Sequence, residues 1–336
     1  GKTTTIYLLY EILRAGDRKP GLLTNLERRV GDEVRPAALN TPEAIDLQRL
    51  LREMASAGNA SCAMEATSHA SVQGRIEGVR FAVLVFTNLA HEHLDFHGTM
   101  EDYFDAKRRL FAQAEHAVVN VGDPWGRRLA DELGDAITFD AGRDRLDARL
   151  KLRGSFNVEN ALGAAAAARA LGIGEDAIRA GIEAVEGVPG RLELVDEGQS
   201  FAVIVDYAHK PASLERVLQE ARALAHGRVL CVFGCGGDRD REKRPLMGRI
   251  ASELADVAIV TSDNPRSEDP LAIIDEIVAG ARGLEVEPDR RLAIARAIES
   301  GREGDVVLIA GKGHEQGQEI AGVKHPFDDR EVAREL

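Results

Sequence analysis

The stretch RVLCVFGCGGDRD, residues 228–240, carries the strand-and-loop pattern that most clearly indicates the fold class. Residues 228–233 form an apolar run, which is typical of a strand covered on both faces of a sheet. Glycines follow at once, and glycine lets a ligand approach the backbone closely. Arg239 in the same loop offers a forked donor to a carboxylate. Cys231 and Cys235 lack the spacing of a zinc site, so we interpret them as a core residue and a loop residue.

Short apolar runs alternate with helical patterns along the rest of the chain. This alternation predicts an α/β protein with parallel sheets and right-handed crossover connections. Besides 228–233, the predicted strands are 61–65, 81–87, 116–121, 136–139, 201–205, 256–261 and 305–310, and the predicted helices are 43–57, 100–113, 157–171, 212–225, 245–254 and 270–281.

Two more strands in the second half also end in polar loops. The run DNPR (263–266) follows the strand 256–261, and the run GKGHE (311–315) follows the strand 305–310. Parallel strands place their carboxyl ends at one sheet edge, where open α/β sheets bind ligands. One such loop could arise by chance, but three at one edge favour a site for a small polar ligand.

A cluster of glycine and proline at 187–190 interrupts the alternation after two helical patterns. Such clusters mark turns and loops. The chain has 336 residues, which is more than one ordinary core accommodates. We therefore expect a first domain over 1–190 and a second domain over 191–336.

Composition excludes several classes of protein. The chain is 44% hydrophobic and carries a net charge of −13, from 43 basic and 56 acidic residues. The apolar content argues against disorder, and the acidic balance argues against broad binding of nucleic acid or a membrane surface. Three cysteines cannot form a disulfide framework, and no apolar run is long enough to span a membrane, so the cytoplasm is the expected compartment.

The first residues, GKTTT (1–5), precede an apolar helical pattern. They match the end of a phosphate-binding loop, in which Lys2 would meet terminal phosphates and Thr3 would meet Mg²⁺. An ordinary helix start is an equally good interpretation of so short a run. Because the chain begins inside this pattern and without Met, we expect a fragment or a trimmed chain.

Three other candidates in the first half are weak on the residues alone. Glu65 follows a predicted strand and could hold Mg²⁺, but a solvated glutamate is the better interpretation. His91, His93 and His97 lie close together, yet nothing fixes a metal geometry, and surface histidines are favoured for His91 and His97. Lys107 reads most simply as a solvated lysine on a helix.

Together these runs resemble the Mur ligases. The resemblance extends from residue 1 to the C-terminus, and the number and order of the motifs make it specific. The region around DNPR is similar to the branch of the family that adds meso-diaminopimelate. The shared runs are GKTT (1–4), ME (64–65), TN (87–88), HLDFHG (93–98), AK (106–107), DYAH (206–209), GGDRD (236–240), DNPR (263–266) and GKGHE (311–315).

The resemblance implies a central P-loop-type parallel-sheet ATPase domain followed by a Rossmann-like C-terminal domain. It also implies an ATP-dependent amide ligase of peptidoglycan precursor synthesis. ATP would phosphorylate the D-glutamyl carboxylate of UDP-N-acetylmuramoyl-L-alanyl-D-glutamate, and the amine of meso-diaminopimelate would attack the acyl phosphate. The implied cofactors are ATP and Mg²⁺, and we expect a monomer.

The same resemblance assigns roles to individual positions. The catalytic set is Lys2, Glu65, His93 and Lys107, and the Mg²⁺ ligands are Thr3, Glu65, His93 and Lys107 as a carbamate. ATP would contact Gly1, Lys2, Thr3, Thr4, Asn160, Arg191 and Asp206, with the last three framing the nucleotide at the domain boundary. The nucleotide-sugar peptide would contact Thr41, Thr67, Gln73 and Arg75, and diaminopimelate would contact Arg239, Asp263, Asn264, Pro265, Arg266, Gly311 and Glu315.

Several features depart from the family pattern. The N-terminal domain and half of the phosphate loop are absent, and the segment between Phe139 and Phe156 is short. Asn40, Glu92 and Lys210 replace the usual Thr, Asp and Thr. Two alternatives therefore stay open: a non-catalytic relative that binds nucleotide or amino acid, or an inactive fragment. A ligase of the folylpolyglutamate synthase type is a third, disfavoured because it has no evident use for DNPR.

Overall fold

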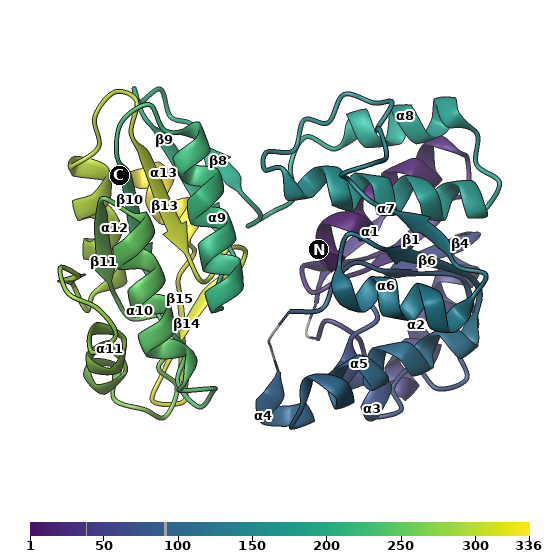
Figure 1. Ribbon diagram of the computed structural model, residues 1–336, viewed down its shortest axis with the longest axis horizontal. Helices are drawn as coiled ribbons and strands as arrows, with labels where there is room; N and C mark the ends of the chain where they lie inside the picture. Colours follow the sequence, from purple (N-terminus) through teal and green to yellow (C-terminus); the bar gives the residue numbers. More distant parts are fainter. Residues whose placement is uncertain (38, 91–92) are drawn as a thin grey trace. The chain divides into compact units, whose positions relative to one another are not determined.

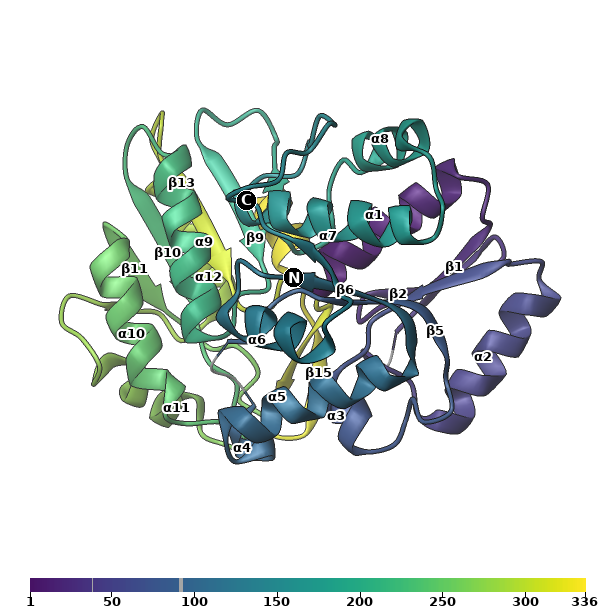
Figure 2. The same cartoon turned by 45° about the vertical axis from the view of Figure 1, so that its right-hand side comes forward.

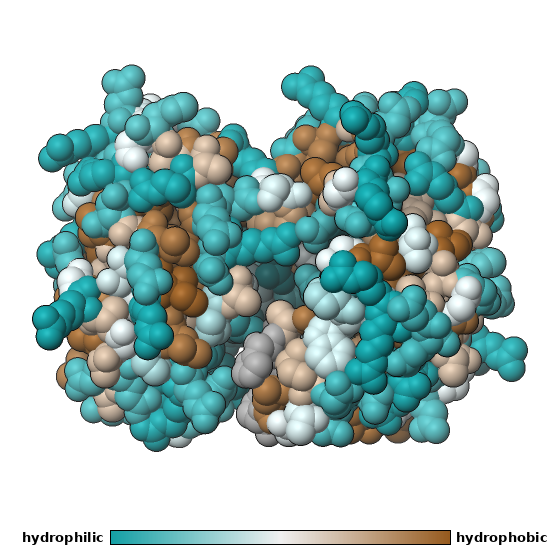
Figure 3. Space-filling view, in the orientation of Figure 1, coloured by the Kyte–Doolittle hydropathy of each residue, from teal (hydrophilic) through white to brown (hydrophobic). Residues whose placement is uncertain are grey.

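The computed structural model describes residues 1–37, 39–90 and 93–336 (Figure 1). The chain divides into two compact units, Gly1–Gly187 and Val188–Leu336. The sequence analysis placed the boundary three residues later, within the same Gly-Pro cluster. None of the described helices is long and apolar enough to cross a membrane. The displayed face of the molecule is predominantly hydrophilic (Figure 3).

The first unit begins with α1 (Lys2–Ala15), which packs on β1 (Pro20–Leu23) and β4 (Ser61–Met64). These two strands are parallel, as predicted for a phosphate-binding fold. The antiparallel strands β2 (Glu27–Val30) and β3 (Glu33–Pro36) complete the sheet in the order β3-β2-β1-β4. Leu47, Leu50 and Met54 of α2 (Ala44–Ser56) bury their side chains in the core beneath this sheet.

A second sheet of the first unit has the parallel order β5 (Phe81–Phe86), β6 (Ala114–Asn120) and β7 (Ile137–Phe139). The helix α7 (Phe156–Ala170) contacts all three strands. Its alanines and Gly163 allow this close approach, because a Cβ on Gly163 would lie 2.9 Å from the ring of Phe139. Elsewhere in this unit lie α3 (Ser68–Val72), α4 (Leu94–His97), α5 (Met100–Arg108), a 3₁₀ turn (Arg109–Gln113), α6 (Pro124–Leu133) and α8 (Glu175–Ala184).

The second unit has one six-stranded sheet in the order β12-β11-β10-β13-β9-β8. All neighbours are parallel except β8 and β9. The central strands β10 and β13 are buried at every residue, which explains their uninterrupted apolar sequences. The strands are β8 (Glu193–Val195), β9 (Ala202–Asp206), β10 (Val229–Phe233), β11 (Val257–Val260), β12 (Glu285–Val286) and β13 (Val306–Ala310).

Helices cover both faces of this sheet (Figures 1 and 2). On one face α12 (Arg290–Glu299) and α13 (Asp329–Glu335) share a core with alternate residues of the strands. The helices α9 (Pro211–Leu224), α10 (Lys243–Leu254) and α11 (Pro270–Val278) pack in succession against the sheet. The arrangement is Rossmann-like, and the chain as a whole has the predicted α/β fold.

All eight predicted strands are present, with ends shifted by at most two residues. The strands β1, β2, β3, β8 and β12, and the hairpin of β14 (Gly317–Ile320) and β15 (Val323–Pro326), were not predicted. Most of these strands are short and partly exposed, so their sequences lack an apolar run. They are held by pairing with neighbours rather than by their own pattern.

Candidate functional site

The first turn of α1 lies beside the carboxylate that follows β4. The Thr3 hydroxyl donates to Glu65 Oε1 at 2.8 Å, and both side chains are buried. The Glu65 amide donates to the Leu23 carbonyl, which continues the pairing of β4 with β1 by one residue. The interpretation of Glu65 as a solvated glutamate is therefore wrong, because the sheet and the helix together remove it from water. A hydroxyl, a carboxylate and a helix N-terminus thus meet at one point.

A chain of hydrogen bonds links this point to positions assigned to the nucleotide-sugar peptide. The Thr41 hydroxyl donates to the Glu65 carbonyl at 2.8 Å and lies 3.3 Å from the Thr67 hydroxyl. Arg75 donates to the Thr41 carbonyl at 3.2 Å. Thr67 also caps α3 by accepting from the Ala70 amide. Gln73, at the end of α3, is exposed.

Asn160 lies on α7 and faces α1. Its side-chain oxygen accepts from the Thr5 hydroxyl at 3.4 Å, and its amide nitrogen donates to Asn157 at 2.8 Å. The side chains of Thr4 and Asn160 are both buried. The structure therefore places the predicted nucleotide residue Asn160 next to the first turns of the predicted phosphate helix.

Lys107 and His93 converge on the ring of Tyr103. The Lys107 ammonium lies 5.1 Å from the centre of this ring and 5.8 Å from that of Phe86. The imidazole of His93 packs edge-on against Tyr103 with 5.8 Å between ring centres. Aromatic faces attract a cation electrostatically, so Lys107 is not a fully solvated lysine.

His97 stacks on the same ring of Tyr103. Its ring is nearly parallel to that of Tyr103 at 4.8 Å, and its Nε2 lies 3.0 Å from the Ser68 hydroxyl. Burial, together with the nearby charges of His93 and Lys107, lowers the pKa of His97. His97 is half-buried, so it lies at the surface but in contact with Tyr103 and Ser68. His91 and Glu92 lie outside the described residues.

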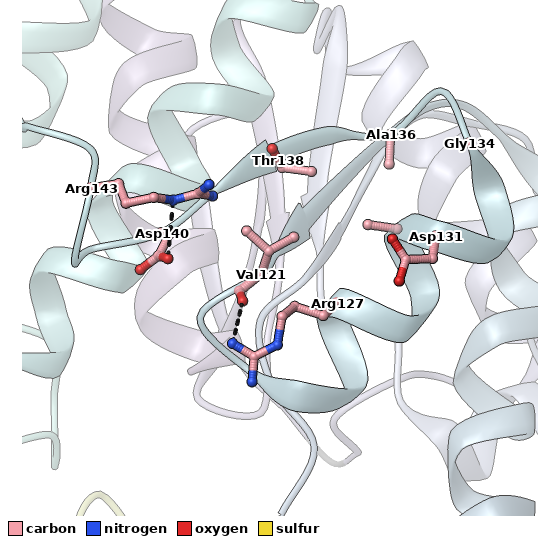
Figure 4. A pocket seen from close by; sticks show the side chains of 9 residues that line it. Val121, Arg127, Asp131, Gly134, Ala136, Thr138, Asp140 and Arg143 are labelled. Carbon is pink, nitrogen blue, oxygen red and sulfur yellow. Dashed lines mark hydrogen bonds and ion pairs between the residues drawn. The ribbon is translucent and has the colours of Figure 1, made fainter.

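A cavity of about 510 Å³ lies beside β6, α6 and β7 (Figure 4). Arg143 pairs with Asp140 at 3.2 Å, and Arg127 donates to the Val121 carbonyl at 3.4 Å on its rim. None of the predicted site residues lines this cavity. Among the described residues, no group of three or more His, Cys, Asp or Glu side chains is arranged to hold a metal ion.

Asp206 closes the end of β9 in the second unit. Its two carboxylate oxygens accept from the amides of Leu192 and Ala208, both at 2.8 Å. Burial raises the pKa of Asp206, although the positive charge of Arg191 acts in the opposite direction. The Arg191 guanidinium lies 4.5 Å from the centre of the Tyr207 ring. Arg191 and Asp206 therefore lie near one another at the end of β9, as their assignment to a common ligand requires.

The loops after β11 and β13 form a second polar cluster. The Asn264 amide nitrogen donates to Glu315 Oε2 at 2.8 Å. Asp263 and Asn264 are buried, and Gly311 borders them with a φ of +122°. A side chain at Gly311 would lie 2.8 Å from the Asp263 carboxylate, so this position needs glycine. The predicted convergence of these two loops is present in the structure.

Arg266 is held beside this cluster in an unusual backbone conformation. Its φ is +54°, which is uncommon for a residue with a side chain. Hydrogen bonds to the β14–β15 hairpin fix it, because its amide donates to the Glu319 carbonyl and its carbonyl accepts from Ala321. Its guanidinium donates to the Gly237 carbonyl at 2.6 Å and lies 3.6 Å from the Glu319 carboxylate. The guanidinium therefore joins the loop after β10 to the hairpin.

The remaining predicted residues differ in how firmly they are held. Pro265 packs tightly, because a Cβ on Gly237 would lie 1.9 Å from its carbonyl. Arg239 is exposed, and its guanidinium donates only weakly, at 3.4 Å, to the neighbouring carbonyl of Asp238. The structure thus brings Asn264 into direct contact with Glu315, next to Asp263, but does not bring Arg239 to them.

Two buried cations in this region were given no role by the sequence analysis. Lys312 lies 3.6 Å from both Asp263 and Glu315 and is fully buried. Arg290 forms a two-pronged ion pair with Asp329 and donates to the Ala310 carbonyl at 3.1 Å. Lys312 could have been noticed because it lies inside GKGHE. Nothing in the sequence around Arg290 distinguishes it from an exposed arginine.

The two carboxylates of the cluster respond differently to their surroundings. Burial acts to raise the pKa of Asp263, but the charges of Lys312 and Arg290 outweigh it and the pKa lies below the usual range. Burial and the negative charge of Asp263 raise the pKa of Glu315. The surroundings therefore favour the ionised form of Asp263, whereas a nearby positive charge would be needed to stabilise the ionised form of Glu315.

Comparison with known families gives two matches. Residues 1–147 match the Mur ligase middle domain, and residues 190–313 match the glutamate ligase domain of Mur ligases. UDP-N-acetylmuramoyl-L-alanyl-D-glutamate--2,6-diaminopimelate ligase of Streptomyces avermitilis is 47% identical, over all of this chain and 74% of the relative. The protein of the same name from Geobacillus kaustophilus is also 47% identical, over 99% of this chain and 76% of the relative.

The alignment with the Streptomyces protein spans 373 positions, although this chain has 336 residues. The relative therefore carries residues in the aligned region that this chain lacks.

Solved structures agree with this assignment. A structure of UDP-N-acetylmuramoyl-L-alanyl-D-glutamate--2,6-diaminopimelate ligase has a TM-score of 0.65 at 33% identity, and the match covers 99% of this chain and 75% of that one. A pseudomurein peptide ligase type C from Methanothermus fervidus has a TM-score of 0.69 at 19% identity, covering 99% and 76%, and shares the fold. With matches to both family domains and 47% identity to the Streptomyces relative over the whole chain, the chain belongs to the Mur ligase family.

Proposed function

We propose that this protein is an ATP-dependent ligase that adds meso-diaminopimelate to UDP-N-acetylmuramoyl-L-alanyl-D-glutamate through an acyl phosphate. The relatives of this name, at 47% identity over the chain, support the reaction. The observation that carries the choice of amino acid is the contact of Asn264 with Glu315 beside Arg266. An amino acid with two ammonium and two carboxylate groups needs both a carboxylate and a guanidinium to recognise its far end.

The N-terminus of α1 is suited to the phosphates of ATP. Backbone amides of the first helical turn and the helix dipole favour negative charge, and Lys2 adds a positive one. We assign Gly1, Lys2, Thr3 and Thr4 to this role. Their surroundings support it, because no acidic residue lies in the first turn of this helix.

The donor set beside α1 fits Mg²⁺, which prefers oxygen ligands and keeps several waters. Thr3 and Glu65 would hold one ion, and their oxygens are already 2.8 Å apart. A bound Mg²⁺ would neutralise phosphate charge and so allow a carboxylate to approach.

Lys107 and His93 are the proposed ligands of a second ion, with Lys107 modified to a carbamate. Addition of carbon dioxide to the neutral amine forms a C–N bond and releases a proton, which converts a cation into an anion. Both side chains contact the ring of Tyr103, which holds them close to one another and supports a common role. The side chain of Lys107 would then present oxygen rather than nitrogen.

Other residues would bind and orient the substrates. Asn160 in the first unit, and Arg191 and Asp206 in the second, are assigned to the nucleotide. Thr41, Thr67, Gln73 and Arg75 are assigned to the nucleotide-sugar peptide, and the hydrogen bonds from Thr41 to Glu65 support this role for the first of them. Positioned reactants convert the attack of the amine on the acyl phosphate into an effectively intramolecular step.

In the second unit we assign Arg239, Asp263, Asn264, Pro265, Arg266, Gly311 and Glu315 to meso-diaminopimelate. Arg266 would pair with the distal carboxylate and Glu315 with the distal ammonium. The raised pKa of Glu315 supports this, because a bound ammonium would stabilise its ionised form. Lysine has no distal carboxylate, so Arg266 would reject it.

The described cysteines are free, and the described helices include no membrane span. By analogy with the Mur ligase relatives, we propose a cytoplasmic enzyme and a monomer.

The test is phosphate release from ATP by the protein translated from its complete reading frame. With the nucleotide-sugar dipeptide present, release should depend on meso-diaminopimelate and should be much slower with lysine. Turnover that ignores the added amino acid would refute the proposal. Calorimetric binding of meso-diaminopimelate without turnover, with Lys107 unmodified in a mass spectrum, would instead identify a non-catalytic relative.

A further inference from the structure

Lys312 is the most enclosed cation of the second unit's polar cluster. Its side chain has no exposed surface. Its ammonium donates to Asn264 Oδ1 at 2.9 Å and lies 3.6 Å from Asp263 Oδ1 and 3.6 Å from Glu315 Oε2. All three partners are residues that we assign to meso-diaminopimelate. A buried lysine needs such partners, because an unpaired charge would be expelled or neutralised.

We propose that Lys312 is a positioning residue that orients Asn264 and Glu315 to recognise the distal ammonium of the amino-acid substrate. The inference rests on the proposed function and extends it to a residue that would not touch the substrate. It follows from three properties of the cluster: the orientation of the Asn264 amide, the use of the Glu315 oxygens, and the balance of buried charge.

Lys312 fixes which way the Asn264 amide points. The side-chain oxygen of Asn264 accepts from the Lys312 ammonium and from the Glu319 amide at 3.0 Å. Because two donors meet this oxygen, the NH₂ group must face the opposite side, where it donates to Glu315. Without the ammonium, one of the two donors that define this orientation is lost.

The Glu315 carboxylate is held from one side only. The contacts with Asn264 and Lys312 both use Oε2, and a third of the side chain is exposed. A carboxylate has about four acceptor positions, so Glu315 retains the capacity to accept from a ligand ammonium. Lys312 thus aims the carboxylate while leaving acceptor capacity on the accessible side.

The charged groups of the cluster leave Glu315 for the ligand. Arg290 is matched by Asp329 in a fully buried pair. Lys312 is shared between Asp263 and Glu315, so two carboxylates face one ammonium. The charges of Arg290, His209 and Lys243 also act on Asp263, whereas Glu315 is one-third exposed and can accept from a substrate ammonium. This arrangement favours an amino acid with a second amino group over one that lacks it.

The test compares two substrates that differ only in the distal ammonium, meso-diaminopimelate and 2-aminopimelate. The variants are Lys312→Met, which removes the charge, Lys312→Gln, which keeps an N–H donor, and Lys312→Arg, which keeps the charge. Lys324→Met is the matched control, because Lys324 is exposed on the neighbouring hairpin. KM and kcat are measured for each amino acid, and KM also for ATP and for the nucleotide-sugar dipeptide.

In Lys312→Met we expect KM for meso-diaminopimelate to rise by about 10- to 100-fold. The KM values for ATP and for the dipeptide substrate should stay within about twofold. The preference for meso-diaminopimelate over 2-aminopimelate should collapse, whereas the preference over lysine, which depends on Arg266, should persist. The KM of Lys312→Gln for meso-diaminopimelate should lie between the values of Lys312→Met and the native protein. The Lys324→Met control should have the native KM.

A preference over 2-aminopimelate that survives in Lys312→Met would overturn the proposal. If both uncharged variants fail to fold while Lys312→Arg folds with the native KM for meso-diaminopimelate and no change in preference, Lys312 is structural and the proposal is also overturned. Failure of the proposed function is a separate outcome, because the native protein itself would then show no turnover that depends on the amino acid.

Discussion

The two units of this protein hold their candidate site residues by different means. Among the described residues, the first unit buries a single charged side chain, Glu65, together with threonine, serine and asparagine side chains. The second unit buries nine charged side chains; four of them form two ion pairs with each other, Arg290 with Asp329 and Lys312 with Asp263, and Arg244, Asp305 and Asp328 pair with partly exposed side chains. Apart from Glu65, the buried polar groups of the first unit are therefore neutral hydrogen-bonding groups, whereas the buried polar groups of the second unit are mostly charged.

This difference fits the ligands proposed for each unit. A triphosphate and a divalent cation neutralise each other when they bind together, so the first unit needs few charges of its own. A zwitterionic amino acid must be recognised at several charged points, and these points must be fixed before it arrives. Buried ion pairs provide that rigidity in the second unit at the cost of desolvation.

The largest expected effect is on the scaffold of the second unit. Arg290→Met leaves Asp329 as an unpaired buried charge, which should reduce the free energy of unfolding by about 3–5 kcal/mol. Urea unfolding of the purified protein measures the change. Arg291→Met is the matched control, because Arg291 pairs with Glu335 on the exposed surface and should lose at most about 1 kcal/mol. Equal effects of the two variants would contradict the contrast between the units.

The first unit should respond in activity rather than in stability. Glu65→Gln keeps the shape of the side chain but removes the charge that would face Mg²⁺. We expect phosphate release to fall by about 100- to 1,000-fold, comparable to the loss of one well-placed electrostatic group. The free energy of unfolding should fall little, because no buried cation depends on Glu65. Glu77→Gln, at an exposed position, is the control, and a large loss of stability in Glu65→Gln would break the comparison.

Arg266→Lys tests the specificity that we assign to the second unit. A lysine cannot reproduce the two-pronged contact of a guanidinium with a carboxylate. The affinity for meso-diaminopimelate should fall by about 1.5–3 kcal/mol. Steady-state kinetics should show this as an increase of KM for the amino acid, with KM for ATP unaffected. An unchanged KM for meso-diaminopimelate would remove Arg266 from the site, and Arg296→Lys on the exposed surface is the control.

A smaller effect is expected from the ion pair of Arg244 with Glu268. Hydrogen bonds from Arg244 lower the pKa of Glu268 from 4.5 to about 2. The folded pKa lies below the unfolded one, so the stabilisation is complete above pH 4.5 and is lost as the pH falls towards 2. The free energy of unfolding of the native protein should therefore decline more steeply in this range than that of Glu268→Gln.

The control for this pH dependence is Glu299→Gln, at an exposed position of α12. It should leave the slope unchanged. Parallel pH profiles of the native protein and Glu268→Gln would contradict the role of this ion pair.

The sequence predicted the three loops of the second site better than it predicted their supports. DNPR and GKGHE stand directly after apolar runs, so their meeting at one sheet edge followed from parallel strand order alone. Arg290 and Asp329 are 39 residues apart and each resembles a surface charge. Burial and pairing depend on how distant segments pack, and no local pattern encodes them.

A similar limit applied to the first unit. The order of the family motifs indicated Glu65, His93 and Lys107 as functional, although the residues around them favoured solvated side chains. The structure buries Glu65 against Thr3 and places Lys107 and His93 against Tyr103. Propensity and spacing describe only neighbours in the chain, whereas these contacts join separate elements.

Apolar periodicity and ordered motifs are local properties of the chain, and they were enough to predict the α/β alternation, the family and the loops that carry the candidate chemistry. The position of Lys312 among Asp263, Asn264 and Glu315, and the dependence of the second unit on internal charge, emerge only when the chain folds. The energy of a charge depends on its burial and its partners, and both are set by residues far away in the sequence.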